Sequence, residues 1–133
     1  MADAKEEDGR DRVDEMATSL ARGRVALGLA ALAAPRLTVK LMGLGGSADP
    51  GRDYVARMFA AREIALGAGY LLSGDDSGRR LWARIGLAVD SIDVASGLKT
   101  RRGMPLWVTA GAVAVAGGAA SIGAAKVARD LVR

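Results

Sequence analysis

From Val25 onward, the chain consists of apolar segments that alternate with short charged stretches. The clearest apolar segment is 105–125, which has twenty-one residues and no charged side chain. As a helix rising about 1.5 Å per residue it would extend about 30 Å, the thickness of the hydrocarbon core of a bilayer. Pro105 suits the first turn of such a helix, and the bases that follow the segment suit its carboxyl end. The pattern predicts a membrane-spanning helix over about 105–126.

Two further helices are indicated by their boundaries. Asp49 followed by Pro50 is typical of an N-cap and a first helical turn, so a helix is expected over about 50–72. The composition of residues 74–78 predicts a turn, after which another helix is expected over about 79–98. Because the turn is short, the two helices should be antiparallel neighbours.

The first helix, over about 20–44, is the weakest of the four. Its continuous apolar core ends at Ala34, and Pro35 breaks or kinks it. The apolar residues after Pro35 are expected to form a short second piece that lies along the membrane surface.

The positions of aromatic and small residues favour a membrane over a soluble bundle. Four of the five aromatic side chains lie near predicted helix ends, where a membrane–water interface would be: Tyr54, Tyr70, Trp82 and Trp107. Small residues spaced by four allow close helix contact in lipid: Ala61, Ala65 and Gly69, then Ala114 and Gly118, then Ala119 and Gly123. The sequence therefore predicts an all-α fold, a four-helix transmembrane bundle over 20–133 with a proline-interrupted first helix.

Residues 1–19 differ in composition from the rest of the chain. They hold seven acidic and three basic side chains, whereas the whole chain has a net charge of +4. We expect a solvated tail that is disordered or a frayed helix. Four spans place both termini on one side, and ten bases flank the helix ends there against six on the other side, which favours cytoplasmic termini. Nucleic-acid binding is disfavoured because the arginine pairs lie in separate turns without interleaved aromatics.

Composition also limits the chemistry that the chain can perform. It has no Cys and no His, which removes thiolate nucleophiles, common zinc sites and the usual general base. The run Gly43-Leu-Gly45-Gly46 lacks the full phosphate-binding pattern and a preceding strand. Asp75 and Asp76 are interpreted as turn formers. We expect no catalytic residues, cofactor or metal.

Five charged side chains fall inside predicted membrane helices and form the candidate polar cluster: Arg57, Arg62, Glu63, Asp90 and Asp93. Such charges normally pair with one another or line a wet cavity. Matching the depths of the two antiparallel helices, we expect Arg62 to bridge Asp90 and Asp93, with Arg57 supporting Asp93. Glu63 joins this cluster or faces another helix. The cluster is interpreted either as a polar pocket or as buried ion pairs that fix helix register.

Three segments together resemble a bacterial family of small four-helix membrane proteins of unknown function. They are Val25–Arg36 followed by Leu41–Leu44, the arginine-acid-leucine-glycine segment Ala56–Gly67, and the paired-aspartate segment Leu87–Asp93. The resemblance covers about residues 22–125 and omits the acidic tail. It implies the fold and a membrane location but carries no activity.

The leading hypothesis is a non-enzymatic inner-membrane protein whose partners are the lipid bilayer and either a second copy or a larger membrane protein. A lipophilic small molecule bound in an inter-helix pocket is compatible with it. The alternative is a membrane-embedded enzyme that uses an Asp–Arg–Asp cluster for acid–base chemistry on an apolar substrate. A third hypothesis is a proton-coupled carrier, which four short helices could form only as an oligomer.

Overall fold

A computed structural model describes residues 1–132 of the chain, and its regular structure there is entirely helical. The elements are α1 (Ala2–Ala33), α2 (Pro35–Leu41), α3 (Pro50–Leu72), α4 (Asp76–Thr100), the short 3-10 helix η1 (Arg101–Gly103) and α5 (Leu106–Leu131). The prediction of an all-α fold is confirmed.

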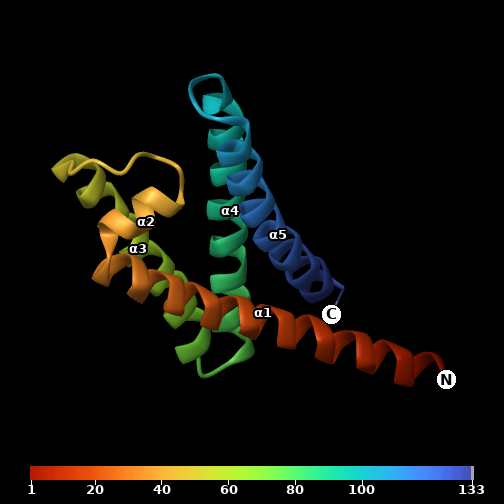
Figure 1. The fold of residues 1–133 in the computed structure, drawn as a ribbon. Coiled ribbons are helices and arrows are strands. Elements are labelled where there is room, and N and C mark those ends of the chain that lie inside the picture. Colours follow the sequence, from red (N-terminus) through yellow and green to blue (C-terminus); the bar gives the residue numbers. More distant parts are fainter. Residues whose placement is uncertain (133) are drawn as a thin grey trace.

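The helices form two antiparallel pairs, α1 with α3 and α4 with α5 (Figure 1). Glycines set the close approach of α1 and α3. A Cβ atom on Gly28 would lie 2.7 Å from the carbonyl oxygen of Ala60, and one on Gly67 would collide with that of Ala21. In the other pair, a Cβ on Gly123 would lie 3.3 Å from the Cβ of Leu87. The packing of α4 and α5 is therefore tight at this point, but a small shift would make room for an alanine.

This pairing corrects the expectation that the helices on either side of the 74–78 turn are close neighbours along their length. Instead, α3 packs mainly on α1, and α4 packs mainly on α5. The two pairs run in different directions, and α1 passes across the lower part of α4 (Figure 1). Turn length limits how far two helices can separate at one end, but it does not fix which faces they bury.

The apolar core is small and lies where the pairs cross. Buried Ala17, Ala21 and Tyr70 form its centre, and the partly buried Trp82 and Ile122 pack against them. The total accessible surface is 8476 Å², whereas a compact monomer of this mass would expose about 6,600 Å². The two-pair arrangement therefore leaves much of its helical surface without a partner in the chain.

The first helix begins earlier than the sequence predicts. The residues expected as a tail, 1–19, continue into α1, and this arm extends beyond the other helices (Figure 1). Salt bridges one turn apart, Arg10 with Glu6 and Arg12 with Asp8, favour the helix locally. At its other end, α1 ends at Ala33, and Ala34 leaves the helical geometry because it directly precedes Pro35.

The loops agree with simple local rules. The Asp49 side chain accepts hydrogen bonds from the backbone N–H groups of Gly51 and Arg52, which caps α3. Asp75 caps α4 through Gly78 N–H, so this helix begins at Asp76 rather than at residue 79. In the loop between α2 and α3, Gly43 and Gly45 have φ angles of +72° and +109°, which favour glycine.

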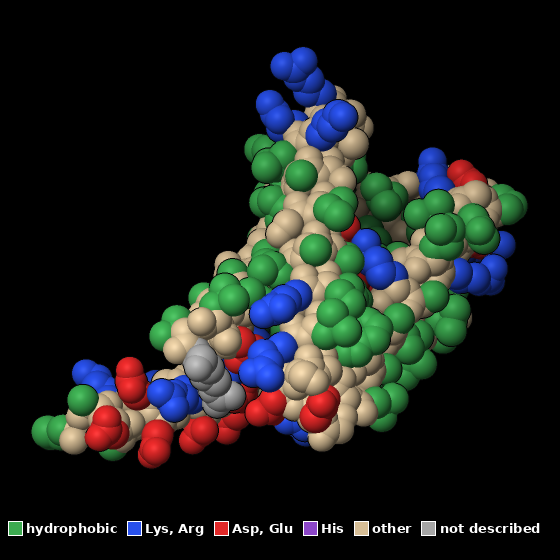
Figure 2. Space-filling model, turned by 180° about the vertical axis from the view of Figure 1, so that it is seen from behind, with side chains coloured by type: hydrophobic (Ala, Val, Ile, Leu, Met, Phe, Trp, Pro, Cys, Tyr) green, Lys and Arg blue, Asp and Glu red, His purple; other side chains and the backbone are tan. Residues whose placement is uncertain are grey.

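Within residues 1–132, one helix is long and apolar enough to cross a membrane, namely α5. Its best window has a mean hydropathy of 1.6, and 17% of that window is buried in the structure. Length and composition therefore support one spanning helix among the described helices, whereas the sequence pattern predicts four. Figure 2 shows hydrophobic side chains over much of the surface, with Lys and Arg at the tip of the α4–α5 turn and mainly acidic side chains along the N-terminal arm.

Candidate functional site

Charged side chains from three helices meet where the two pairs cross. Arg24 of α1 donates one hydrogen bond to Glu63 of α3, at 2.8 Å, and another to Asp90 of α4, at 2.5 Å. Their side chains are 9%, 5% and 4% exposed, respectively. A buried charge is costly unless it is paired, so this arrangement ties three helices to one another.

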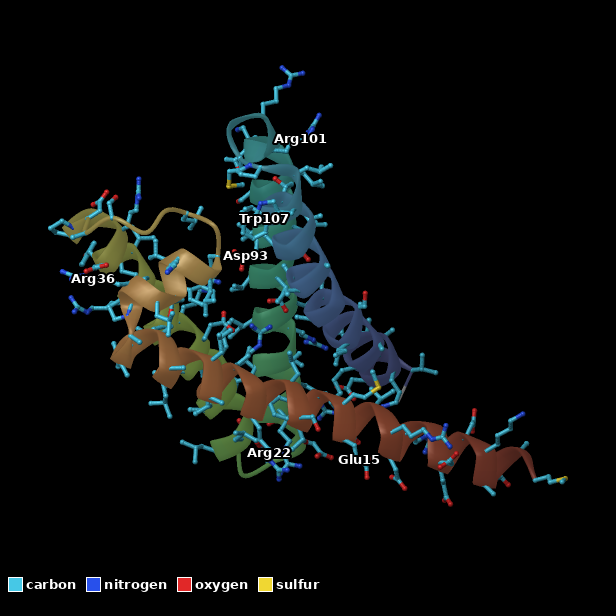
Figure 3. The ribbon with its side chains drawn as sticks, viewed as in Figure 1. Glu15, Arg22, Arg36, Asp93, Arg101 and Trp107 are labelled. Atoms are coloured by element: carbon cyan, nitrogen blue, oxygen red, sulfur yellow. The ribbon has the colours of Figure 1, made fainter. Side chains whose placement is uncertain are left out.

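A second guanidinium extends this network toward the surface. Arg62 donates to both carboxylate oxygens of Asp93, at 3.0 and 2.8 Å, and to Glu63 at 3.3 Å. Its guanidinium also lies 5.1 Å from the centre of the Phe59 ring. Asp93 lies on the side of α4 that faces the α2–α3 region (Figure 3). Because Glu63 contacts both arginines, the five side chains Arg24, Arg62, Glu63, Asp90 and Asp93 form one continuous network, called the junction network below.

The junction network differs from the expected cluster in two respects. Arg62 does not bridge Asp90 and Asp93, because Asp90 is bonded to Arg24 instead. Arg57 is exposed on α3 and has no ion pair among the described residues. It is five residues from Arg62, about 140° around the helix, so the two side chains cannot point to the same neighbour. The structure brings Arg62, Glu63, Asp90 and Asp93 together and leaves Arg57 out.

Arg24 is the residue that the sequence reasoning missed. In the sequence it precedes the first charge-free run, so it resembles a base that flanks a helix end. A signal was nevertheless present: Arg24 interrupts a stripe of small residues at helical spacing, comprising Ala17, Ala21, Gly28 and Ala31, all of which are buried. A single cation in such a stripe indicates a buried partner of opposite charge.

A second ion network joins α1 to the carboxyl end of α5. Lys126 Nζ lies 2.9 Å from Asp14 and 3.1 Å from Asp130, and Arg129 contacts Asp14 at 2.5 Å. Burial of the Asp14 carboxyl raises its pKa, but the hydrogen bonds and charges of Arg129 and Lys126 outweigh this and lower the pKa below its ordinary value. This network fastens the N-terminal arm to α5.

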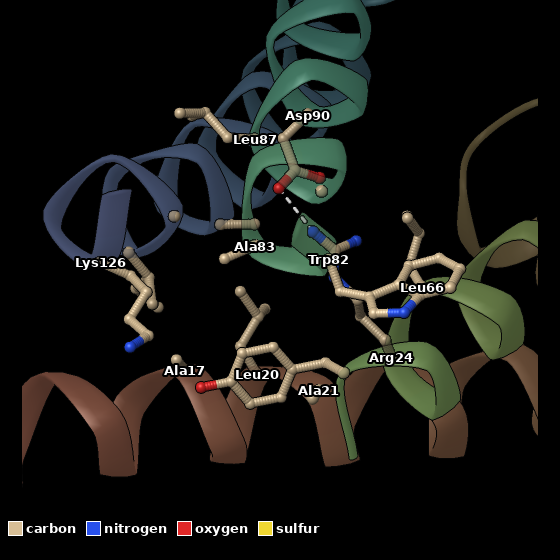
Figure 4. Close-up of a pocket in the computed structure, with 15 residues that line it drawn as sticks. Ala17, Leu20, Ala21, Arg24, Leu66, Trp82, Ala83, Leu87, Asp90 and Lys126 are labelled. Carbon is tan, nitrogen blue, oxygen red and sulfur yellow. Dashed lines mark hydrogen bonds and ion pairs between the residues drawn. The ribbon is translucent and has the colours of Figure 1, made fainter. Parts of the chain in front are cut away.

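A small cavity lies between the two networks. It is lined by Arg24 and Asp90 toward α4, by Lys126 of α5, and by the rings of Tyr70 and Trp82 (Figure 4). Its volume is about 40 Å³, enough for about three water molecules and far below the roughly 300 Å³ at which ligand pockets begin. The junction can therefore be hydrated, but it has no room for a substrate.

The described residues offer no group of three or more acidic side chains placed to hold a metal ion. Comparisons with protein-family models, with curated proteins and with solved structures found no match for this chain. The resemblance to a family of small four-helix membrane proteins therefore stays a prediction.

Proposed function

We propose that the protein is a small, non-enzymatic membrane protein of the bacterial inner membrane. Its two helix pairs are fastened by the junction network, and its exposed apolar faces pack against lipid and against a second copy or a larger membrane protein. The observation that carries this proposal is α5: a helix of 26 residues with a charge-free stretch of membrane length that is mostly uncovered.

The exposure of α5 is what distinguishes it from the core helix of a soluble protein. A soluble core helix of this hydropathy would be buried on most sides, whereas α5 contacts the rest of the chain mainly through α4. Leu106, Trp107 and Val115 are exposed along it. An apolar helix surface of this kind needs an apolar environment, because its exposure to water is unfavourable.

Pairing of the internal charges supports the same proposal for the other helices. A charged side chain in hydrocarbon is tolerated when it faces the interior of the protein and finds a partner. Arg24, Glu63 and Asp90 satisfy both conditions. With these charges paired inward, the outward faces of α3 and α4 keep exposed apolar side chains such as Met58, Leu81 and Ile92.

The enzyme alternative required a substrate beside Asp90 and Asp93. Both carboxylates are engaged by arginines, and the adjoining cavity has the volume of a few water molecules. A structural role of the ion pairs fits this geometry better than acid–base chemistry does.

Carbonate extraction tests the proposal. Membranes from cells expressing the protein are washed with high salt and then with alkaline carbonate. We expect the protein to stay in the pellet and to dissolve in mild detergent, because an integral helix is held by apolar burial rather than by charge. Recovery as a folded helical monomer in the carbonate supernatant would refute the proposal.

A further inference from the structure

A groove of ligand size lies away from the junction network, between α2, the loop after it and the first half of α3. Its volume is about 470 Å³, within the range of small-molecule sites. Val39 and Leu44 line one side, and Val55, Ala56 and Phe59 line the other. The walls are therefore almost wholly apolar, which suits a hydrocarbon chain.

Glycine geometry holds the loop that frames this groove. Gly43 and Gly45 have positive φ angles, and a side chain on either would collide with a neighbour. At Gly43 the neighbours are Trp107 and Val108 of α5, so the loop rests on the start of that helix. At Gly45 the neighbour is the guanidinium of Arg52. The groove is thus part of the packed structure and is bounded on several sides.

The helices that frame the groove carry exposed apolar side chains outside its lining as well: Leu37 and Leu41 on α2, and Tyr54 and Met58 on α3. Both helices are therefore suited to an apolar environment, from which an apolar occupant can reach the groove.

The charges at the polar edge of the groove select the sign of the occupant. Arg36 is paired with Asp53 at 3.3 Å, and Arg52 is paired with Asp49 at 3.3 Å. Lys40, next to the groove residue Val39, is exposed and has no ion pair among the described residues. Its stem lies against the loop, with Cδ 4.0 Å from the position of a Cβ on Gly46. Asp49 and Arg52 both line the groove and pair with each other, so the positive charge left beside the loop is that of Lys40.

We propose that this groove binds one acyl chain of an anionic phospholipid, whose phosphate is held by Lys40 and Arg52. The proposal rests on the membrane location proposed above. A bilayer lipid suits the groove because the walls are apolar, the volume fits one acyl chain and Lys40 adds a positive charge beside the loop. A zwitterionic lipid offers the same chains without the net negative charge that the edge attracts.

Native mass spectrometry of the protein in mild detergent tests this. Phosphatidylglycerol and phosphatidylcholine with identical acyl chains are titrated separately. We expect one phosphatidylglycerol to be retained preferentially. The double variant Lys40→Gln and Arg52→Gln should bind it about 25-fold more weakly, taking roughly fivefold, or about 1 kcal/mol, for each cation removed. Val55→Trp, which fills the groove, should weaken the binding of both lipids.

Matched controls separate the groove from the rest of the surface. Lys99→Gln with Arg102→Gln removes two exposed bases elsewhere, and Met58→Trp adds a ring to α3 outside the groove lining. Both controls should bind phosphatidylglycerol as the unaltered protein does. Equal retention of the two lipids, an unaffected double variant, or a co-purified free fatty acid in place of phospholipid would overturn the inference. Carbonate extraction of the same variants reports separately on the membrane location, so the two proposals can fail independently.

Discussion

The guanidinium of Arg24 is shared by carboxylates from two other helices: it is the ion-pair partner of Asp90 and one of the two partners of Glu63. Paired charges of this kind need not add net stability relative to an apolar core, but removing one partner leaves the other uncompensated. This asymmetry makes the junction network a device that specifies how the two helix pairs cross. It penalises every arrangement in which Arg24, Glu63 and Asp90 are apart.

Arg24→Ala should therefore destabilise the fold by roughly 3–5 kcal/mol, because Glu63 and Asp90 stay buried without Arg24. Arg24→Ala combined with Glu63→Gln and Asp90→Asn should recover much of this loss, since no uncompensated charge is left at the centre. The measurement is denaturant unfolding in detergent, followed by circular dichroism. Arg57→Ala, an exposed arginine on the neighbouring helix, is the matched control and should unfold like the unaltered protein. Additive effects of the three substitutions would contradict the shared network.

At the scale of elements, the sequence predicts where helices begin and end better than it predicts which helices pack together. Asp49 and Pro50 mark the start of α3, and Pro35 marks the break between α1 and α2, because capping and proline geometry are local. The contact of α1 with α3 depends on Gly28 and Gly67 meeting carbonyl groups of another helix. Nothing local to either glycine identifies its partner. Depth matching of the helices joined by the short turn therefore predicted the Arg62–Asp93 pair correctly but not the pairing of α1 with α3.

The same distinction applies to the N-terminal arm. Its local composition indicates a solvated segment, and most of its side chains are indeed exposed. What fastens the arm to the rest of the fold is a long-range contact: Asp14 reaches Lys126 and Arg129, which are more than a hundred residues away in the chain. A sequence pattern shows the excess of acids but not the basic patch that fastens one of them.

The arm should be released from α5 by acid. The pKa of Asp14 is lowered in the folded protein, so its ionised carboxyl stabilises the contact with α5. This stabilisation is fully present above pH 3.8, the ordinary pKa of the group, and is lost as the pH falls through the lower pKa of the folded state. A spin label on Gly9→Cys, in a chain without native Cys, reports the mobility of the arm. At neutral pH, Asp14→Asn should increase that mobility, and at pH values below the folded pKa the two proteins should behave alike. Glu15→Gln, which alters the adjacent exposed acid, should change nothing at neutral pH.

At the scale of the whole molecule, the two-pair arrangement separates polar ends of the structure by apolar faces, which suits a protein in a membrane. The amino and carboxyl ends lie toward the same end of the structure, and η1 lies at the far tip of the α4–α5 pair (Figure 1). Exposed apolar side chains occupy the faces between these polar ends (Figure 2). If α5 crosses a bilayer, antiparallel packing makes α4 its natural partner in the crossing, and the junction network would then bring α1 and α3 to the same depth.

Reporter fusions test this topology. Reporters at the carboxyl terminus and after Ala4 should both indicate the cytoplasm, whereas one inserted at Gly103 in η1 should indicate the opposite face. The reason is the distribution of bases: the ends near the termini carry more of them than the opposite ends, and basic segments stay cytoplasmic. Arg101→Gln with Arg102→Gln should leave this orientation unchanged or strengthen it, because it removes bases from the far side. Opposite signals from the two termini would mean an odd number of crossings. The helix that does not span would then be α1, which ends before Pro35.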